Sequence, residues 1–245
     1  MDYSLFVDTL PGKYKDWGTA KCQPENPAFA DLLKSVCGMT TASVLQLLNF
    51  AVSWLEDREI YCEVGTYQGA TLIGALGGNQ AIGHGIDNFS EFNDKENEAI
   101  LMENCKNQLV RAKDRVVIHR DDCEKTLTHP SFNSRIGVFF YDGAHDYRST
   151  LMALLLARRH LADRALIVVD DWNFKHVQQA VHDFLAVIDE TRVELTLTTN
   201  HNGEEPWWNG LIVISCDCIR LAQAGPPHKI KTVCDRIYSI RDGQE

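Results

Sequence analysis

Residues 60–71 read IYCEVGTYQGAT, and this stretch decides the fold. A mostly apolar run ends at Val64, two glycines follow at Gly65 and Gly69, and a pattern of helical spacing begins at Ala70. This order predicts a buried strand, a tight turn and a helix, which together form one unit of a parallel α/β sheet. The three residues between the glycines differ from the G-x-G-x-x-G of dinucleotide pyrophosphate sites. The turn therefore favours a ligand without phosphates.

The same alternation continues along the chain. Further apolar runs predict strands at residues 81–86, 115–119, 136–141 and 165–169, and amphipathic stretches predict helices at 70–76, 95–109, 149–161 and 177–188. Two more strands, 193–198 and 211–215, are joined by the polar loop 199–210 without a helix, so the last strand is expected to run antiparallel. The pattern predicts a doubly wound α/β sheet flanked by helices.

Three regions of the chain differ in pattern. Residues 1–26 show no clear periodicity and residues 42–54 have helical spacing, so 1–55 is expected to be a loop and helical extension that acts as a lid or contacts a second subunit. The sheet domain is predicted over 56–220, followed by a C-terminal tail at 221–245. A homo-oligomer is one expectation of such an extension.

Composition limits the partners. The chain has 245 residues, of which 44% are hydrophobic, and its 24 Lys and Arg against 34 Asp and Glu give a formal charge of −10. This disfavours nucleic acid and anionic membranes, both of which bind basic patches, and it favours a small neutral or cationic ligand. The sequence lacks an apolar run of roughly 18 to 20 residues and a signal-peptide pattern, which predicts a cytoplasmic protein.

The eight cysteines are scattered through the predicted strands and helices. This distribution favours buried reduced thiols over disulfides. Cys216 and Cys218 form a CxC pair, but a zinc site would need a second pair, and none follows at a suitable spacing.

Carboxylates follow the end of nearly every predicted parallel strand. In chain order they are Glu63, Asp87, Asp121, Asp122, Asp142, Asp170 and Asp171. Ligands of open α/β sheets bind beyond the carboxyl ends of the strands, so these acids are expected to surround the site. Asp87 lies 22 residues after Gly65, close to the spacing at which an acid binds ribose hydroxyls.

The segments EVGTYQGAT, GIDNF, RDDCEKTL, YDGAHDY and VVDDWN resemble, in that order, the successive motifs of class I S-adenosylmethionine-dependent methyltransferases. The resemblance covers roughly residues 59 to 216 and implies a Rossmann-like seven-stranded sheet with an antiparallel last strand. It places Glu63 and Gly65 beside the methionine part of the cofactor, Asp87 on the ribose, and Asp122 with Cys123 at the adenine. The full implied set of cofactor contacts is Glu63, Gly65, Thr66, Tyr67, Gly69, Asp87, Asn88, Asp122, Cys123 and Asp142. For Asp122 the alternative is a solvated acid or the N-cap of a helix at 124–127.

The acids after the fourth and fifth parallel strands indicate a narrower group of methyltransferases. Asp142, Asp170 and Asp171 are similar to the magnesium ligands of the metal-dependent small-molecule O-methyltransferases, including the macrocin and catechol types. Magnesium prefers carboxylate and water oxygens, and neighbouring buried acids would repel one another without a cation. The alternative is that one acid caps a helix starting near Asn173 while the others are solvated.

The proton acceptor is less clearly marked. Some sugar O-methyltransferases of this type have a basic Asp two residues after the first metal acid, and here that position is Ala144. His145 is the nearest substitute, and its ordinary pKa of about 6.5 suits proton removal near neutral pH. The candidate catalytic residues are thus His145 and Asp142. The alternative for His145 is a structural contact that orients the acid loop.

Trp207 and Trp208, in the loop before the last strand, are candidates for the wall of an acceptor pocket, with packing over the sheet as the alternative. Together these features predict magnesium-dependent O-methylation of a small molecule, such as a sugar diol or a catechol. Two alternatives remain open at this stage: a cofactor-binding protein without turnover, and a metal-dependent hydroxylase or hydrolase on the same fold.

Overall fold

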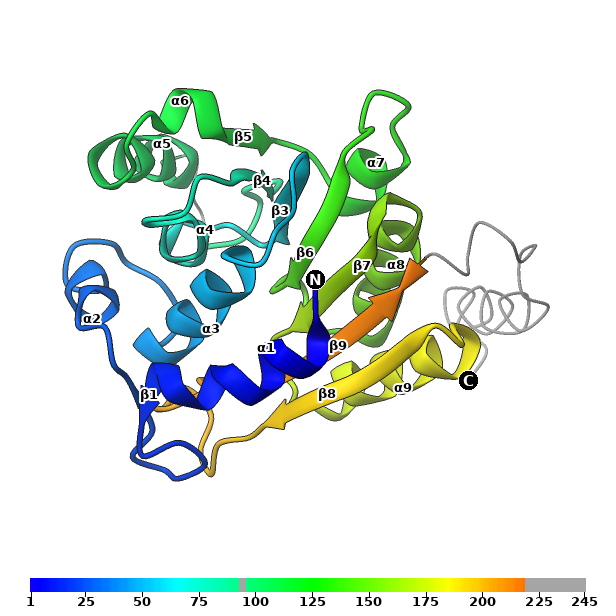
Figure 1. The fold of residues 1–245 in the computed structure, drawn as a ribbon. Coiled ribbons are helices and arrows are strands. Elements are labelled where there is room, and N and C mark those ends of the chain that lie inside the picture. The colour runs from blue at the N-terminus through cyan, green and yellow to red at the C-terminus, as the bar shows by residue number, and fades with distance from the viewer. Residues whose placement is uncertain (93–95, 219–245) are drawn as a thin grey trace.

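A seven-stranded sheet organises the computed structural model, which describes residues 1–92 and 96–218. Its strands are β3 (Glu59–Val64), β4 (Ile82–Ile86), β5 (Val116–His119), β6 (Arg135–Tyr141), β7 (Leu161–Val169), β8 (Thr191–Leu197) and β9 (Leu211–Asp217). The spatial order is β5-β4-β3-β6-β7-β9-β8, and β9 pairs antiparallel with both of its neighbours (Figure 1). The predicted α/β sheet with an antiparallel last strand is therefore confirmed.

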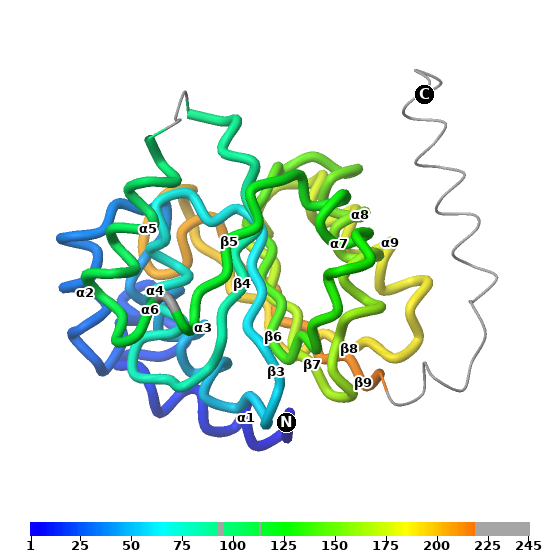
Figure 2. Tube along the Cα trace, turned by 90° about the horizontal axis from the view of Figure 1, so that it is seen from above, coloured from blue at the N-terminus to red at the C-terminus, as the bar shows by residue number. Residues whose placement is uncertain are grey.

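Helices cover both faces of the sheet (Figure 2). One face carries α3 (Ala42–Val52), α4 (Ala70–Leu76), α5 (Asn97–Gln108) and α6 (Ala112–Arg115), and the other carries α7 (Cys123–Thr128), α8 (Tyr147–Ala157) and α9 (Lys175–Val187). A separate buried hydrophobic cluster lies on each side. The central strands are buried on both faces, which explains why they are apolar almost throughout.

Backbone hydrogen bonds beyond the ladders align the ends of the central strands. Gly65 N donates to Ile86 O (3.0 Å), Asp142 N to Val64 O (2.9 Å) and Asp170 N to Tyr141 O (2.9 Å). The residues that follow β3, β4, β6 and β7 consequently meet at one edge of the sheet. This arrangement brings the strand-end acids together.

The N-terminal region is more regular than the sequence predicted. It contains α1 (Tyr3–Thr9), the 3-10 helix η1 (Leu10–Lys13), the short strands β1 (Tyr14–Lys15) and β2 (Gln23–Pro24), and α2 (Ala28–Leu32). The Phe6 ring of α1 stacks on Phe50 of α3 with a centroid distance of 5.3 Å, and the Tyr3 hydroxyl donates to the Cys216 carbonyl oxygen at 2.8 Å. Residues 1–55 thus share the core on one face of the sheet. Their contact with a second subunit stays a prediction, and the expected tail at 221–245 lies outside the described residues.

Two predicted helices end earlier than expected. The helix at 42–54 ends at Val52, and the helix at 149–161 ends at Ala157, where a 3-10 turn η2 (Arg158–His160) leads into β7 at Leu161. Leu161 has the apolar character of the helix pattern but pairs with Ile136 in the sheet. Pairing with a neighbouring strand, which the local pattern does not contain, sets this boundary.

The seven cysteines in the described part of the chain are all free thiols, and five of them are buried. Cys216 and Cys218 have their sulfur atoms 2.9 Å apart in the core. Cys234 lies outside the described residues.

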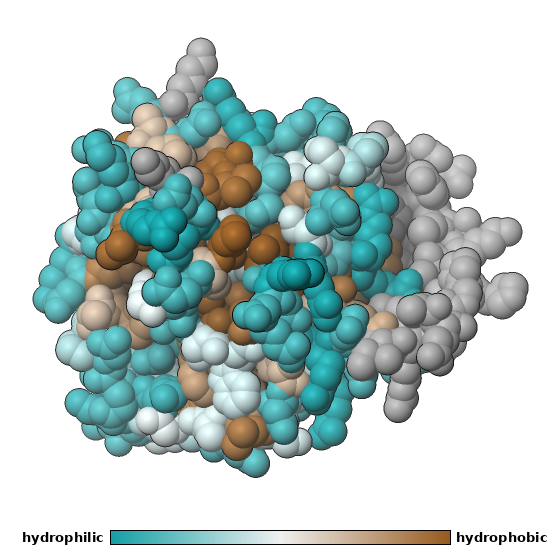
Figure 3. All heavy atoms as spheres, turned by 45° about the horizontal axis from the view of Figure 1, so that its top comes forward, coloured by the Kyte–Doolittle hydropathy of each residue, from teal (hydrophilic) through white to brown (hydrophobic). Residues whose placement is uncertain are grey.

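Within residues 1–92 and 96–218, no helix is long and apolar enough to cross a bilayer. The face drawn in Figure 3 is mostly hydrophilic, and its hydrophobic residues gather near the centre.

Candidate active site

A cavity of about 550 Å³ lies at the carboxyl ends of the central strands. Its wall includes the glycine turn after β3, the acid after β4, the start of α7, the loop after β6 and part of the loop before β9. Of the predicted cofactor residues, those that line it are Gly65, Thr66, Tyr67, Asp87, Asn88, Asp122, Cys123 and Asp142. The structure therefore brings together most of a set that is widely spread along the sequence.

The turn after β3 requires both of its glycines. Gly65 and Gly69 have φ of 86° and 89°, in the left-handed region that favours glycine. A Cβ on Gly65 would lie 1.9 Å from the Asp142 carbonyl oxygen, and one on Gly69 would lie 2.9 Å from a methyl group of Leu101. Gly69 begins α4 rather than lining the cavity. Its role is to let the chain turn from the strand into the helix.

Asp87 holds this turn in place. Its Oδ2 accepts the backbone N–H groups of Thr66 (2.9 Å) and Tyr67 (2.8 Å), and its Oδ1 accepts that of Phe89 (2.7 Å). A carboxylate has about four lone-pair sites, so three backbone bonds leave capacity for one further donor. Asp87 can thus organise the turn and still accept a hydroxyl from a ligand in the cavity.

Glu63 lies behind the cavity wall. It is fully buried, accepts the Tyr61 hydroxyl at 2.6 Å and the Thr71 hydroxyl at 3.3 Å, and is absent from the cavity lining among the described residues. Burial raises the pKa of its carboxyl to about 8. The expectation that Glu63 contacts the methionine part of a cofactor is corrected: its side chain shares a strand face with Tyr61 and packs under α4.

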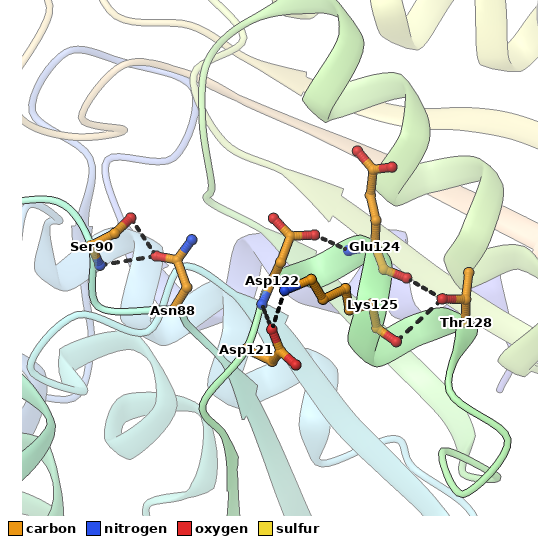
Figure 4. Close-up of polar contacts among 7 residues, drawn as sticks. All are labelled: Asn88, Ser90, Asp121, Asp122, Glu124, Lys125 and Thr128. Atoms are coloured by element: carbon orange, nitrogen blue, oxygen red, sulfur yellow. Dashed lines mark hydrogen bonds and ion pairs between the residues drawn. The ribbon is translucent and has the colours of Figure 1, made fainter.

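Asp122 caps a helix and also lines the cavity, while its contact with a cofactor stays a prediction. Its Oδ1 accepts the Glu124 N–H at 2.8 Å and caps α7, while the residue also lines the cavity (Figure 4). Only one of its two carboxylate oxygens takes part in this cap. Asn88 lies across from it, with its amide oxygen accepting the N–H and the hydroxyl of Ser90 at 2.9 and 2.7 Å. Asp121 pairs with Lys125 at 3.3 Å on the exposed side.

Three more acids follow β6 and β7. Burial, and then the charges of Asp170 and Asp171, raise the pKa of Asp142 well above its usual range. Burial and the charge of Asp171 do the same to the pKa of Asp170. The Asp170 Oδ1 accepts the Asp171 N–H at 2.8 Å, while its Oδ2 is buried without a hydrogen-bond partner.

Asp171 is engaged through both of its oxygens. Oδ2 lies 2.8 Å from His145 Nε2, and Oδ1 accepts the side-chain amide of Asn209 at 2.7 Å. The residue has φ of 61°, in the left-handed region, which is strained for a residue with a Cβ. The surrounding contacts hold the backbone in this conformation and direct the carboxylate toward His145.

The three acids predicted to hold magnesium do not gather into one ligand cluster in this structure. In the described residues there is no group of three His, Cys, Asp or Glu side chains that could hold a metal ion. Asp171 is bound to two protein donors, and Asp170 is absent from the described lining of the cavity. The alternative, in which an acid caps the next helix, is not observed, because α9 begins after Phe174 without a side-chain cap.

His145 projects into the cavity from the loop after β6. Its ring stacks on Phe174 with a centroid distance of 5.4 Å and an interplanar angle of 9°. The hydrogen bond to Asp171 raises its pKa, because the carboxylate stabilises the imidazolium, and burial opposes this effect. His145 therefore contacts the acid loop, as one of its two alternatives predicted, and it also lines the cavity; its role as the proton acceptor stays a prediction.

The paired tryptophans have different environments. Trp208 lines the cavity with φ of 55°. Trp207 is 4% exposed and packs against Tyr14 (5.5 Å) and Trp17 (5.8 Å), outside the cavity lining. Trp207 as an acceptor-pocket residue is thus wrong, and packing over the sheet is its role.

Sequence reasoning missed two parts of the wall. Gly38, Met39 and Thr40, just before α3, line the cavity, and the neighbouring Thr41 hydroxyl donates to the Pro206 carbonyl oxygen at 2.6 Å. The loop before β9 adds Asn202, Gly203 and Asn209. The concentration of asparagines at 200–209 was a signal for a structured loop, but no local pattern connects it to residues 38–40.

A family described as a methyltransferase domain matches residues 62–172, the segment that contains the glycine turn and all the strand-end acids. No curated protein is recognisably similar to this chain.

Several solved structures share the fold. An O-methyltransferase from Bacillus cereus in complex with SAH is 14% identical, with a TM-score of 0.55, over 79% of this chain and 92% of that one. The O-methyltransferase TomG from Streptomyces achromogenes, in complex with SAM, is 14% identical, with a TM-score of 0.57, over 79% and 91%. An rRNA methylase from Streptococcus thermophilus is 15% identical, with a TM-score of 0.51, over 69% and 93%. At these identities the likeness establishes the fold and leaves the acceptor to the site.

Proposed function

We propose that this protein, whose residues 62–172 match a family described as a methyltransferase domain, is a class I S-adenosylmethionine-dependent enzyme that methylates a hydroxyl oxygen of a small neutral or cationic molecule. One observation carries the proposal. The His145–Asp171 pair, with 2.8 Å between Nε2 and Oδ2, opens into the same cavity as the glycine turn and Asp87. The residues proposed to hold the cofactor and the proposed proton acceptor therefore line one cavity.

S-adenosylmethionine supplies an electrophilic methyl group on a sulfonium cation. The residues that would hold it are the turn at Gly65 and Thr66, the remaining lone-pair capacity of Asp87 for a ribose hydroxyl, and Asn88, Asp122 and Cys123 at the far end of the cavity. Ionised acceptors form hydrogen bonds about twice as strong as neutral ones, which suits Asp87 and Asp122 to this role.

His145 would accept the proton of the acceptor hydroxyl. Its Nε2 faces Asp171 Oδ2, so Nε2 carries the hydrogen of that bond and Nδ1 is the nitrogen with a free lone pair. Nδ1 would take the proton of the acceptor hydroxyl, while the bound cofactor would supply the methyl group to the oxygen and its sulfur would keep the electron pair of the carbon–sulfur bond. Asp171 stabilises the imidazolium that forms, without taking the proton itself.

The charge of the cavity supports the class of acceptor. The described lining residues include seven acids and no lysine or arginine; the acids are Asp87, Glu91, Asp121, Asp122, Glu124, Asp142 and Asp171, of which Asp121 and Glu124 pair with Lys125 and Arg148. A carboxylate or phosphate on the acceptor would be repelled by them, and a polyanion such as RNA would be repelled more strongly. A sulfonium cofactor and a neutral or cationic acceptor match this field.

Three catechols test the proposal because they share one ring and differ in charge. Calorimetry with S-adenosylhomocysteine measures cofactor binding first, and formation of S-adenosylhomocysteine then measures turnover. We expect dopamine and catechol to be methylated with a lower KM than protocatechuate, whose carboxylate faces the acid lining. Failure to bind S-adenosylhomocysteine contradicts the proposal. Binding without turnover of any hydroxyl compound favours the alternative of a cofactor-binding protein without activity.

A magnesium requirement is a separate proposal that comes from the resemblance to metal-dependent enzymes. It is supported by the neighbouring carboxyl groups of Asp142, which is partly buried, and Asp170, which is buried, and by the unpartnered Asp170 Oδ2. It is an alternative to the His145–Asp171 pair, because a metal bound by Asp171 would require this residue to leave both His145 and Asn209. Loss of turnover in EDTA with recovery in Mg²⁺, together with Mn²⁺ binding detected by electron paramagnetic resonance, would support it. Unchanged turnover in EDTA would contradict it.

A further inference from the structure

The side-chain amide of Asn209 connects the loop before β9 to the acid that holds His145. Its Nδ2 donates to Asp171 Oδ1 at 2.7 Å, and its Oδ1 accepts the Gly203 N–H at 2.9 Å. Because the amide oxygen faces a donor on one side, the amide nitrogen must face the carboxylate on the other. The two contacts fix the orientation of the amide.

The backbone of Asn209 and of the next residue is also fixed by hydrogen bonds. Asn173 N donates to Asn209 O at 2.9 Å, and Trp172 N donates to Gly210 O at 3.0 Å. These bonds join the turn after β7 to the residues just before β9, so Asn209 cannot move away from Asp171 without breaking them. The contact is therefore part of a rigid junction between two segments of the cavity wall.

Asn209 determines which carboxylate oxygen of Asp171 can bond to His145. Asp171 is 3% exposed, and its Oδ1 is taken by Asn209, so Oδ2 is the oxygen left for the imidazole. Stacking on Phe174 limits the plane of the His145 ring, and the bond to Asp171 limits its rotation within that plane. Without Asn209, Oδ1 would be a buried carboxylate oxygen with no donor, which is costly. The carboxylate of Asp171 would then be expected to rotate toward another hydrogen-bond donor.

We propose that Asn209 is a positioning residue for methyl transfer: it holds Asp171 in the orientation that keeps His145 Nε2 bound and His145 Nδ1 directed at the acceptor hydroxyl. This inference rests on the proposed role of His145 as the proton acceptor. It adds a residue from the loop before β9 to a site whose other parts follow the central strands.

The inference can be tested without any acceptor by nuclear magnetic resonance on the whole protein labelled with ¹⁵N-histidine. A hydrogen-bonded imidazole N–H exchanges slowly with water, and His145→Gln identifies the signal that belongs to this residue. We expect a protected His145 Nε2–H signal in the natural protein. In Asn209→Leu, which keeps the branched shape and removes the donor, we expect exchange to be faster by about tenfold or more.

Asn202→Leu is the matched control. Asn202 lies in the same loop and lines the same cavity, but its side chain contacts Asn173, with 2.9 Å between Oδ1 and the Asn173 Nδ2. We expect this variant to retain slow exchange at His145. Thermal melting establishes that each variant is folded, and Asn209→Ser, which perturbs the packing less, replaces Asn209→Leu if the latter unfolds.

Two results would overturn the inference: an unprotected His145 N–H in the natural protein, or the same slow exchange in the Asn209 variants. With whichever catechol is turned over, we expect Asn209→Leu to lower kcat by about tenfold or more and to change KM little, because a misplaced base affects the chemical step. Protection that depends on Asn209, with no hydroxyl compound methylated, would contradict the proposed function and leave the positioning contact intact.

Discussion

The carbonyl oxygen of Asp142 occupies the space in which residue 65 would carry a side chain, because a Cβ on Gly65 would lie only 1.9 Å from it. The same two segments are joined by the hydrogen bond from Asp142 N to Val64 O at 2.9 Å. The ends of β3 and β6 therefore approach as closely as two backbones can. The shape of the cavity depends on this contact.

Substituting Gly65 should disrupt both stability and ligand binding. We expect Gly65→Ala to lower the free energy of unfolding by at least about 2 kcal/mol, since the new methyl group meets backbone atoms and φ is 86°. Urea unfolding and calorimetry with S-adenosylhomocysteine measure the two effects. Gly12→Ala is the control, because no atom lies within 4 Å of a Cβ at that position. If Gly65→Ala behaves like the natural protein in both assays, the close approach of β3 and β6 does not shape the cavity.

Asp87→Asn should weaken cofactor binding more than it destabilises the fold. The amide can accept fewer N–H groups than the carboxylate and carries no charge, so both the turn and the ligand contact are weakened. We expect Kd for S-adenosylhomocysteine to rise by about tenfold or more, which corresponds to at least about 1.4 kcal/mol. Asp121→Asn, at the exposed rim, should change Kd little. Equal effects of the two substitutions would argue against a specific role for Asp87.

The paired histidines His84 and His119 should make stability depend on pH. His84 Nδ1 and His119 Nε2 are 3.1 Å apart, and both rings contact Phe132. Burial, and then the charge of His119, lower the pKa of His84 to about 4. The unfolded chain therefore takes up a proton first as the pH falls below about 6.5. The contribution of neutral His84 is fully present above pH 6.5 and is lost as the pH falls toward 4.

Urea unfolding at several pH values between 7.5 and 4.5 measures this contribution as the difference between the natural protein and His84→Phe. We expect the variant to gain on the order of 1–3 kcal/mol relative to the natural protein over this range. Buried carboxyls with raised pKa act in the opposite direction, and they cancel in the difference. His201→Phe, in an exposed loop, is the control. Parallel stability curves for His84→Phe and the natural protein would contradict the assignment.

Substitution of Trp207 should mainly lower stability, and substitution of Trp208 should mainly weaken binding of the acceptor. Trp207→Ala removes a buried ring that packs on Tyr14 and Trp17, and we expect it to lower the free energy of unfolding by about 3–5 kcal/mol. Trp208→Ala should destabilise the fold less and raise KM for a catechol acceptor, because Trp208 lines the cavity. Chemical unfolding and initial rates distinguish them. An unchanged KM in Trp208→Ala would remove this residue from the acceptor site.

The sheet could be predicted from sequence because its strands are buried on both faces. Runs such as that of β6 are apolar almost throughout, and the helices between them leave a parallel order as the simple solution. The helix α1 could not be predicted in the same way. Asp2 caps it, with its Oδ1 accepting the Leu5 N–H at 3.1 Å, but seven residues form a stable helix only when Phe6 packs on a distant element.

The sequence predicts which residues lie near the candidate site when their position follows from the end of a strand. It does not predict the direction in which their side chains point. The acids at the carboxyl ends of the strands gather as the topology requires. The direction of Glu63 follows from its sharing a strand face with Tyr61, and the burial of Trp207 follows from contacts with residues 14 and 17. The hydrogen-bond partners of Asp171 are residues 145 and 209. Both are more than 20 residues away along the chain, so no local sequence pattern predicts these contacts.

The hydrogen bond from Tyr3 to the carbonyl of Cys216 joins groups that are 213 residues apart. During synthesis on the ribosome α1 emerges before every strand of the seven-stranded sheet, yet its hydrogen-bond acceptor belongs to β9, the strand of that sheet that is made last. β9 itself must insert between β7 and β8, both of which are made earlier. Contacts of such long range form late, since the loop must be closed before they contribute. Phe6 can pack on Phe50 of α3 early, but the bond from Tyr3 that ties α1 to the sheet forms only when nearly all of the described sheet exists.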